Sequence, residues 1–363
     1  MGIGYVIREN VSNFFDSFQT RIRFWVRRRY LRSDIDKFNY EVKPLSKEQK
    51  RAIKAYWKPY SKHICYKWHT FFYSLTGNFD VRYIPEDLMM TDIEGYLNDW
   101  SSAHGVDNKN NYQFYFSDVK QPQSVFHKMR GVWHLGDYRV CSFEEAVESA
   151  SQYEMIVTKY ALDAGKGASL RFWKQKDGID ALRSLMNSLP ADAVGQEFVS
   201  QHPKLAAFNP SSVNSVRIVT LIFEEQIHVL AAYLRMGQDG ALLDNVCAGG
   251  LCCSILPNGE LRPFGYDKHA KRVSRHPAGI DFAGFRVPGY ANIVETAKKL
   301  HGRMGNFRII SWDFAVDENE QPIFIEMNLK YGAMEYHQLQ TGPLFGDMTD
   351  RLLNEVYRKG NRK

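Results

Sequence analysis

Apolar residues recur along this chain at two spacings, and each spacing predicts a different secondary structure. Near the N-terminus they stand three and four positions apart, as an amphipathic helix requires, at Ile7, Val11, Phe14, Phe15, Phe18, Ile22, Trp25 and Val26. Two later segments open with a serine that can cap a helix, at Ser46 and Ser142. A further helix is predicted for "IPEDLMMTDIEGYLNDWSSA".

Short runs rich in β-branched and aromatic residues predict strands instead. Such runs are "YQFYFSDV" at 112–119, "YEMIVTKY" at 153–160, and the segments around Arg217 and Arg235. Residues 309–328, "IISWDFAVDENEQPIFIEMN", read as two strands joined by a tight acidic turn. The first 140 or so residues mix helices with a little strand, and we find no set of residues there that indicates chemistry.

The hairpin at 309–328 carries three oxygen-bearing side chains inside its apolar runs. Glu326 and Asn328 are two residues apart, so they project from one face of their strand, and the turn places Asp313 roughly opposite Glu326. Two carboxylates this close repel each other unless one is protonated or a cation lies between them. Oxygen ligands without Cys or His suit Mg²⁺. The hairpin therefore indicates half of a magnesium–nucleotide site, and the alternative is a solvated outer sheet face.

The composition of the 363 residues, 44% hydrophobic and 24% charged, is that of a globular protein large enough for two or three lobes. No run of about eighteen apolar residues is present. The N-terminus lacks the compact apolar core and cleavage site of a secretory signal. The cysteines are odd in number and form no CxxC pair, which predicts reduced thiols and a cytoplasmic protein.

The positive charge is concentrated in one segment. Six arginines and no acidic residue lie between Arg21 and Arg32, which equals the net charge of +6, so the remainder is close to neutral. This distribution argues against a nucleic-acid-binding surface. An apolar stripe flanked by arginine, with Trp and Phe in it, suits the surface of an anionic membrane. The alternative is a helix docked on the body of the protein or on a partner.

The middle of the chain contains candidate phosphate-binding residues. A strand with Lys159 leads into a loop with Gly165, Lys166 and Gly167, and a second strand follows. Glycines let backbone amides approach an anion, and a lysine on the preceding strand can neutralise phosphate charge. The loop is not a Walker A sequence, because glycine follows Lys166. It indicates a hairpin flap over phosphates, or otherwise only a β-turn.

Arg217 and Arg235 lie inside apolar strands, where an unpaired guanidinium is unfavourable and each requires an anion. Structural ion pairs with sheet carboxylates could supply that anion. With Asn245 and the flexible pair Gly249–Gly250 that follow, the two arginines also fit a pocket for phosphate and acyl phosphate.

Taken in order, these pieces resemble the ATP-grasp superfamily, and in particular its sugar-transfer associated branch, which is found with polysaccharide-synthesis enzymes. The similarity covers roughly Asn78 to Gly346, with the motifs "TGNFDVRYIPEDL", "TKYALDAGKG", "QEFVSQHP", "SVNSVRIVTL", "LRMG", "DNVCAGG", "SWDFAV", "IEMN" and "HQLQTGPLFG". The resemblance implies an α+β fold of the ATP-grasp type, in which two α+β subdomains grip ATP after a mixed α/β N-terminal region.

The resemblance also implies roles for individual residues. Residues 196–199 would form the hinge that meets adenine. The residues implied to bind ATP are Lys159, Gly165, Lys166, Gly167, Gln196, Glu197, Phe198, Val199 and His202. Those implied to hold Mg²⁺ are Asp313, Glu326 and Asn328, and those implied to act on the transferred phosphoryl group are Arg217, Arg235 and Asn245.

Five regions follow from this division. They are a basic amphipathic helix (1–37), a mixed α/β region (38–140), an ATP-grasp lid with a glycine-rich flap (141–200), a catalytic subdomain (201–346) and a C-terminal helix (347–363).

The implied activity is an ATP-dependent carboxylate–amine ligase that works through an acyl phosphate, acting on small-molecule or glycan-linked substrates in the biosynthesis of a surface polysaccharide. Two alternatives remain at the level of sequence: a kinase-like phosphotransferase acting on a sugar, and an ATP-binding regulator of a glycosyltransferase complex without catalysis. The expected location is the cytoplasm, with peripheral contact at the inner face of the membrane through the N-terminal helix.

Overall fold

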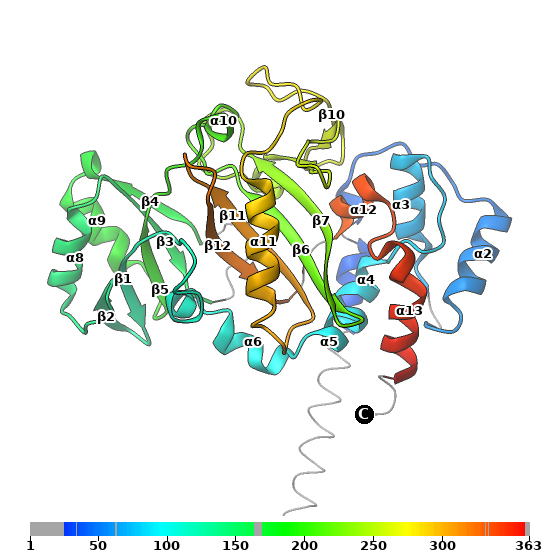
Figure 1. Ribbon diagram of the computed structural model, residues 1–363, viewed down its shortest axis with the longest axis horizontal. Coiled ribbons are helices and arrows are strands. Elements are labelled where there is room, and N and C mark those ends of the chain that lie inside the picture. Colours follow the sequence, from blue (N-terminus) through cyan, green and yellow to red (C-terminus); the bar gives the residue numbers. More distant parts are fainter. Residues whose placement is uncertain are drawn as a thin grey trace, which may run out of the picture. The chain divides into compact units, whose positions relative to one another are not determined.

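The computed structural model describes residues 25–33, 35–61, 64–162, 169–330, 332 and 334–359, and it divides into two compact units (Figure 1). Unit 1 comprises Met1–Leu97 with Ala333–Lys363, and unit 2 comprises Asn98–Gly332. The predicted N-terminal helix is helical over residues 25–33, and residues 1–24 lie outside the described part of the chain. Within the described residues, none of the helices combines the length and the apolar character needed to cross a bilayer.

Unit 1 is helical, and its described residues contain no strand. Besides residues 25–33, its elements are η1 (Ile35–Lys37), α2 (Lys47–Trp57), α3 (Tyr66–Thr76), α4 (Glu86–Leu88), η2 (Met89–Ile93), α5 (Glu94–Leu97), α12 (Glu335–Thr341), η7 (Gly346–Met348), α13 (Thr349–Asn354) and η8 (Glu355–Lys359). Helix α2 begins where the sequence predicts, because Ser46 Oγ accepts the Gln49 N–H and Gln49 Oε1 accepts the Ser46 N–H. The helix predicted from "IPEDLMMTDIEGYLNDWSSA" is confirmed over Glu86–Leu97, where α4, η2 and α5 follow one another, but it is interrupted at Asn98 and Asp99, after which a separate helix, α6 (Trp100–Val106), begins.

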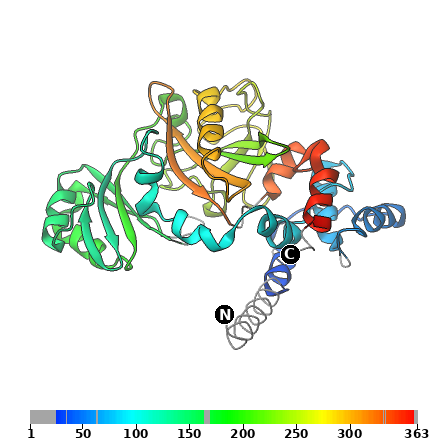
Figure 2. The ribbon, with the colours of Figure 1, turned by 60° about the horizontal axis from the view of Figure 1, so that its bottom comes forward.

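The first sheet of unit 2 has five antiparallel strands in the order β2-β1-β5-β3-β4. The strands are β1 (Ser124–Met129), β2 (Val132–Leu135), β3 (Met155–Tyr160), β4 (Arg171–Lys174) and β5 (Ala193–Glu197). Helices α8 (Phe143–Ser151) and α9 (Ile179–Asn187) pack beside this sheet, and Phe126, Trp173 and Leu182 are buried in their common core (Figures 1 and 2). Strands β1 and β2, which the sequence analysis places in the region 38–140, therefore share a sheet with the predicted lid.

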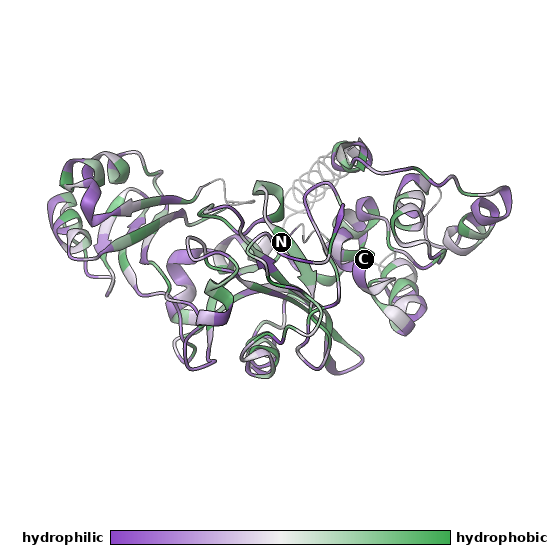
Figure 3. Ribbon diagram, turned by 90° about the horizontal axis from the view of Figure 1, so that it is seen from above, coloured by the Kyte–Doolittle hydropathy of each residue, from purple (hydrophilic) through white to green (hydrophobic). Residues whose placement is uncertain are grey.

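The second sheet of unit 2 has seven antiparallel strands in the order β10-β9-β8-β7-β6-β11-β12. The strands are β6 (Val216–Phe223), β7 (Gln226–Met236), β8 (Leu251–Ser254), β9 (Gly265–Tyr266), β10 (Arg272–Val273), β11 (Ile309–Val316) and β12 (Pro322–Asn328). Helix α11 (Tyr290–His301) covers one face, on which Trp312 and Phe314 join the largest apolar core. Figure 3 shows hydrophobic residues concentrated along these central strands. Side chains alternate along β11, so the residues between these two apolar ones, such as Asp313, take the opposite face.

Short elements connect the sheets of unit 2: α6 (Trp100–Val106), η3 (Lys109–Asn111), α7 (Tyr112–Tyr115), η5 (Gln175–Asp177), α10 (Pro203–Ala206) and η6 (Val246–Ala248). The strand predicted for residues 112–119 is wrong, because this segment is helical at α7. Tyr112 and Phe116 are four residues apart and both pack against Phe324. That contact requires the helical spacing, whereas the alternating aromatic residues in the sequence suggest a strand equally well.

Candidate active site

A cleft opens between the two sheets of unit 2, with about 860 Å³ of empty space including its open mouth. The first sheet and the chain leaving it contribute Val157, Lys159, Phe172, Gln196, Glu197, Phe198 and Val199. The second sheet and its loops contribute Val213, Ser215, Arg235, Asp244, Asn245, Ile325 and Glu326. The cleft thus brings together predicted residues of all three kinds, for nucleotide, metal and phosphoryl transfer.

Lys159 is the buried cation on the first wall of the cleft, in β3. Burial lowers the pKa of its ammonium group from 10.5 to about 8, although the carboxylates of Glu326 and Asp313 oppose that shift. The ammonium group is therefore mostly charged at neutral pH, and it loses its charge as the pH rises above about 8.

The predicted hinge, residues 196–199, comprises the last two residues of β5 and the two that follow it. The Glu197 N–H donates to the Gln123 carbonyl at 2.9 Å, and the Phe198 N–H donates to the Met155 carbonyl at 3.3 Å. Both strands that flank β5 therefore hold the start of this segment in place, at the edge of the cleft.

Lys109 also lines the cleft, and the sequence analysis did not single it out. Its Nζ lies 3.6 Å from the Glu326 carboxylate, and its backbone N–H donates to the Ala161 carbonyl. The neighbouring Asn108 caps η3 by accepting the Asn110 N–H. In the sequence Lys109 stands in "DNKNN", among Asp and Asn residues that can cap a helix. This pattern is equally typical of an ordinary turn, so it does not mark Lys109 as a site residue.

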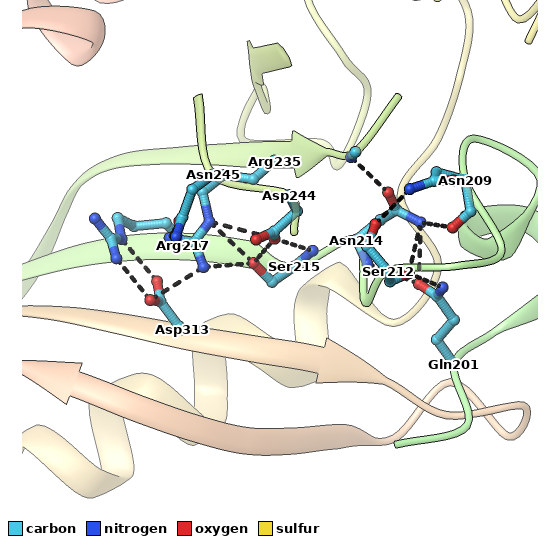
Figure 4. Close-up of polar contacts among 11 residues, drawn as sticks. Gln201, Asn209, Ser212, Asn214, Ser215, Arg217, Arg235, Asp244, Asn245 and Asp313 are labelled. Atoms are coloured by element: carbon cyan, nitrogen blue, oxygen red, sulfur yellow. Dashed lines mark hydrogen bonds and ion pairs between the residues drawn. The ribbon is translucent and has the colours of Figure 1, made fainter. Parts of the chain in front are cut away.

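Arg235, at the floor of the cleft, belongs to an ion-pair network centred on Asp313, and Asp313 and Arg217 lie behind the lining residues (Figure 4). Arg217 donates to both oxygens of Asp313, from Nε at 2.7 Å and from Nη2 at 2.6 Å, and Arg235 Nη2 lies 3.1 Å from Asp313 Oδ2. Asp313 is fully buried. Burial alone would raise the pKa of its carboxyl, but the guanidinium groups of Arg217 and Arg235 outweigh burial and hold this pKa at about 2.

The strand pairing and the ion pairs of Asp313 test two of the predictions made for the hairpin at 309–328. The predicted pairing is confirmed, since Asp313 lies opposite Glu326 and Ser311 lies opposite Asn328 in the register. The predicted solvent-exposed alternative is wrong for Asp313, which has no exposed surface. The charge of Asp313 is balanced by two arginines, as in the ion-pair alternative, so repulsion between the two carboxylates does not dominate the site.

Arg235 is held from three further sides. Its Nε and Nη2 donate to Ser215 Oγ at 3.0 and 2.7 Å, and its Nη1 donates to Asn245 Oδ1 at 3.0 Å. Asp244 lies 3.4 Å from Arg235 Nε and accepts from both the N–H and the hydroxyl of Ser215. The guanidinium is therefore fixed in one orientation at the surface of the cleft, and Asn245 is one of the groups that orient it.

The pair Gly249–Gly250 packs closely against the loop that carries Asp244. Gly249 has φ of +105°, and a Cβ added to Gly250 would lie 2.3 Å from the Asp244 carbonyl oxygen. Gly250 is therefore required for close backbone approach to Asp244, and the positive φ of Gly249 favours glycine there.

Asn214 fixes the chain just before β6, next to Ser215 and on the side away from Arg217 (Figure 4). Its Nδ2 donates to the carbonyls of Leu205 and Asn209, both at 2.9 Å, and its Oδ1 accepts the Gly237 N–H at 3.0 Å. The motif "SVNSVR" thus joins an anchoring asparagine to the two residues that it positions.

Asn328 carries a buried amide nitrogen that is unsatisfied among the described residues. Rotating this amide by 180° would place its oxygen there instead, as a cation ligand requires. The described residues contain no group of three or more His, Cys, Asp or Glu side chains arranged as a metal site. A site of two carboxylates and one amide, completed by ligand oxygens, still fits the donor chemistry of Mg²⁺.

Some predicted residues are not brought to the cleft. His202 caps α10, where its Nδ1 accepts the Lys204 N–H at 3.1 Å, and it does not line the cleft as the described residues define it. The predicted flap residues Gly165, Lys166 and Gly167 lie outside the described residues.

Residues 178–349 match the family model of the sugar-transfer associated ATP-grasp proteins. This part of the chain belongs to that family. It contains the seven-stranded sheet, the floor of the cleft and the hinge, so the match and the two antiparallel sheets confirm the predicted α+β, ATP-grasp class. The strand with Lys159 and the turn with Lys109 precede the matched residues. No curated protein matches the chain.

Solved structures similar to this chain include three ligases. They are an L-amino acid ligase from Bacillus licheniformis (13% identity, TM-score 0.39, 69% of this chain and 48% of that chain), D-alanyl-alanine synthetase A from Vibrio cholerae (10%, 0.42, 68% and 65%) and the VanG D-Ala:D-Ser ligase from Enterococcus faecalis (13%, 0.41, 69% and 60%). The chain spans about half the length of the first of these proteins.

Proposed function

We propose that the protein is an ATP-dependent carboxylate–amine ligase that works through an acyl phosphate. The observation that carries the proposal is the cleft between the two sheets, in which Lys109, Lys159 and Arg235 face Glu326 above the Arg217–Asp313 pair. Such a site has basic groups for phosphates and carboxylates for a cation, which is the equipment of phosphoryl transfer. Membership of residues 178–349 in an ATP-grasp family supports the same reaction class.

In the first step a substrate carboxylate oxygen attacks the γ-phosphorus of ATP. The bond from that phosphorus to the β,γ-bridging oxygen breaks, which gives ADP and an acyl phosphate. In the second step an amine attacks the acyl carbon, phosphate leaves with the bonding electron pair, and the amine loses a proton to form the amide. Both steps require positioning and charge neutralisation more than a protein nucleophile.

Different residues of the cleft would position the substrates and neutralise their charge. Lys159 and Lys109 would neutralise the ATP phosphates, and the hinge at residues 196–199 would hold the base. Arg235 would face the transferred phosphoryl group, because Ser215 and Asn245 already hold its guanidinium at the cleft surface. Arg217 lies behind it and fixes Asp313.

Mg²⁺ would be held by Glu326, Asn328 and Asp313, where it would neutralise phosphate oxygens. Glu326 has a quarter of its side chain exposed, whereas Asp313 is fully buried and is bound by arginines on both oxygens. Asp313 therefore contributes to the site both as a candidate ligand and as the anion that keeps two buried arginines in place.

The family description supports a substrate from glycan biosynthesis. The test of the reaction is to follow the products by ³¹P NMR with uronic acids or amino acids as carboxylates and with amino sugars or amino acids as amines. We expect ADP and inorganic phosphate only when a carboxylate and an amine are both present. A stable phosphorylated sugar without free phosphate would instead identify a phosphotransferase, and no turnover with any pair would favour an ATP-binding regulator.

The affinity for ATP should fall as the pH rises through about 8. Lys159, whose pKa is held at about 8 by burial, is charged below that pH and neutral above it, so phosphates lose an attractive partner as it deprotonates. The limiting slope is about tenfold in affinity per pH unit. Calorimetric titration with ATP between pH 7 and 9.5 measures it. Lys159→Arg is the control, because arginine stays charged and should flatten the profile. The same slope in both proteins would assign the titration to another group.

A further inference from the structure

The described part of the N-terminal helix, residues 25–33, is docked on unit 1 by one of its faces. Arg32 Nε donates to Asp87 Oδ2 at 2.7 Å, and the Asp87 side chain is fully buried. Arg28 Nε donates to Thr91 Oγ1 at 3.0 Å, and Arg28 also pairs with Asp92. Leu31 is buried beside them. Two of the six arginines between Arg21 and Arg32 are thus paired with acidic residues of unit 1 itself.

The opposite face of the same helix is exposed and carries large aromatic side chains. At 100° per residue, Trp25, Val26, Arg29 and Tyr30 fall on the side away from Arg28 and Leu31. Trp25, Val26 and Tyr30 are 61%, 53% and 46% exposed. Guanidinium groups lie over both rings, that of Arg29 at 5.7 Å from the Trp25 ring centroid and that of Arg27 at 5.9 Å from the Tyr30 ring centroid.

The phase of the apolar residues in the sequence matches this exposed face. As a pattern in the sequence alone, Ile7, Val11, Phe14, Phe15, Phe18 and Ile22, which lie outside the described residues, are spaced so that a continuous helix would carry them on the side of Trp25 and Val26. The apolar stripe predicted from the sequence is therefore in register with the exposed face and out of register with the docked one. Docking on the body, one of the alternatives from the sequence, is thus observed for one face of residues 25–33, and the opposite face is exposed.

We propose that the exposed face, defined by Trp25, Val26, Arg29 and Tyr30, docks on an anionic membrane surface. Tryptophan and tyrosine favour the headgroup level of a bilayer, and arginine beside them attracts anionic lipid. Between Arg21 and Arg32 there is no acidic residue, so charge complementarity selects an anionic surface. A second copy of this chain would bring like charges together on the same face. The proposal does not depend on the ligase reaction.

Co-sedimentation with vesicles tests the proposal on the full chain. We expect binding to phosphatidylcholine vesicles that contain about 30% phosphatidylglycerol or phosphatidylserine, and little binding to pure phosphatidylcholine. The variant Trp25→Ser/Arg29→Glu/Tyr30→Ser should bind the anionic vesicles at least about tenfold more weakly, since it removes two interfacial aromatic groups and reverses one charge. Point changes on the exposed face are preferable to deleting the helix, because deletion would leave the buried Asp87 without Arg32.

The matched control is Lys50→Glu/Val140→Ser, which makes the same change in net charge and removes an exposed apolar side chain elsewhere. It should retain vesicle binding. Equal binding of the wild-type protein and the triple variant, or equal binding of the wild-type protein to anionic and neutral vesicles, would overturn the proposal. So would a change from a dimer to a monomer in the triple variant by light scattering, because the face would then bind a second copy.

Discussion

Replacing Asp313 with asparagine is expected to destabilise the protein and to abolish ATP turnover together. Asp313 is the buried anion between Arg217 and Arg235, so its loss leaves two buried guanidinium groups without a counter-charge. Breaking a buried ion pair on one side typically costs about 3–5 kcal/mol of unfolding free energy. Denaturant unfolding followed by circular dichroism measures the stability, and release of ADP measures turnover.

The pKa of Asp313 sets the pH at which the same loss appears in the wild-type protein. Because the folded pKa, about 2, lies below the ordinary value of 3.8, the stabilisation is fully present above pH 4 and is lost as the pH falls towards 2. The variant Asp313→Asn should lack this part of the acid dependence.

Asp118→Asn is the matched control for Asp313. Asp118 accepts two hydrogen bonds from Arg303, both at 2.6 Å, with the same two-pronged geometry, but the pair is on the surface. We expect no measurable loss of stability or turnover. A stable, active Asp313→Asn protein would show that the network is dispensable and that Asp313 is not part of the site.

Removing either lysine of the cleft is expected to weaken ATP binding by about tenfold to a hundredfold, because a charge-assisted hydrogen bond to an anion contributes about 1.5–3 kcal/mol. Lys159→Ala removes the buried cation on β3, and Lys109→Ala removes the cation that reaches Glu326 from η3. Calorimetric titration with ATP at pH 7 measures both.

Lys120→Ala is the control for the two lysines, since Lys120 pairs with Asp317 at 2.6 Å and does not line the cleft. Its ATP affinity should match the wild-type value. If Lys159→Ala and Lys109→Ala also bind ATP as the wild-type protein does, the nucleotide site must lie elsewhere.

The sequence predicts the structure well where residues that are close along the chain are also in contact in the fold. A tight turn joins β11 to β12, so the pairing of Asp313 with Glu326 follows from the hairpin alone. Helix starts at Ser46 and Ser142 are equally local, because each capping interaction spans only three residues. Arg217 and Arg235 were recognised as strand residues that require anions, and the structure supplies Asp313 and Asp244.

The sequence was uninformative where distant segments meet. Lys109 reaches Glu326 across more than two hundred residues of chain, and nothing in "DNKNN" indicates that partner. Strands β1 and β2 were missed because strand order is set by pairing with β5, which lies some sixty residues later. The aromatic residues at 112, 114 and 116 alternate as in a strand, and only the packing of Tyr112 and Phe116 on Phe324 selects the helix α7.

Trapping of the acyl phosphate by hydroxylamine tests the central claim most directly. The wild-type protein, MgATP and a panel of uronic acids and amino acids are incubated at neutral pH with hydroxylamine in place of the natural amine, and the acyl hydroxamate is measured by its coloured iron complex. The account predicts a hydroxamate with at least one carboxylate, in equal amount to the ADP released. It also predicts none with Asp313→Asn, whose cleft lacks the anion that holds Arg217 and Arg235. ADP release that yields a stable phosphorylated sugar, with no hydroxamate from any carboxylate, would contradict it.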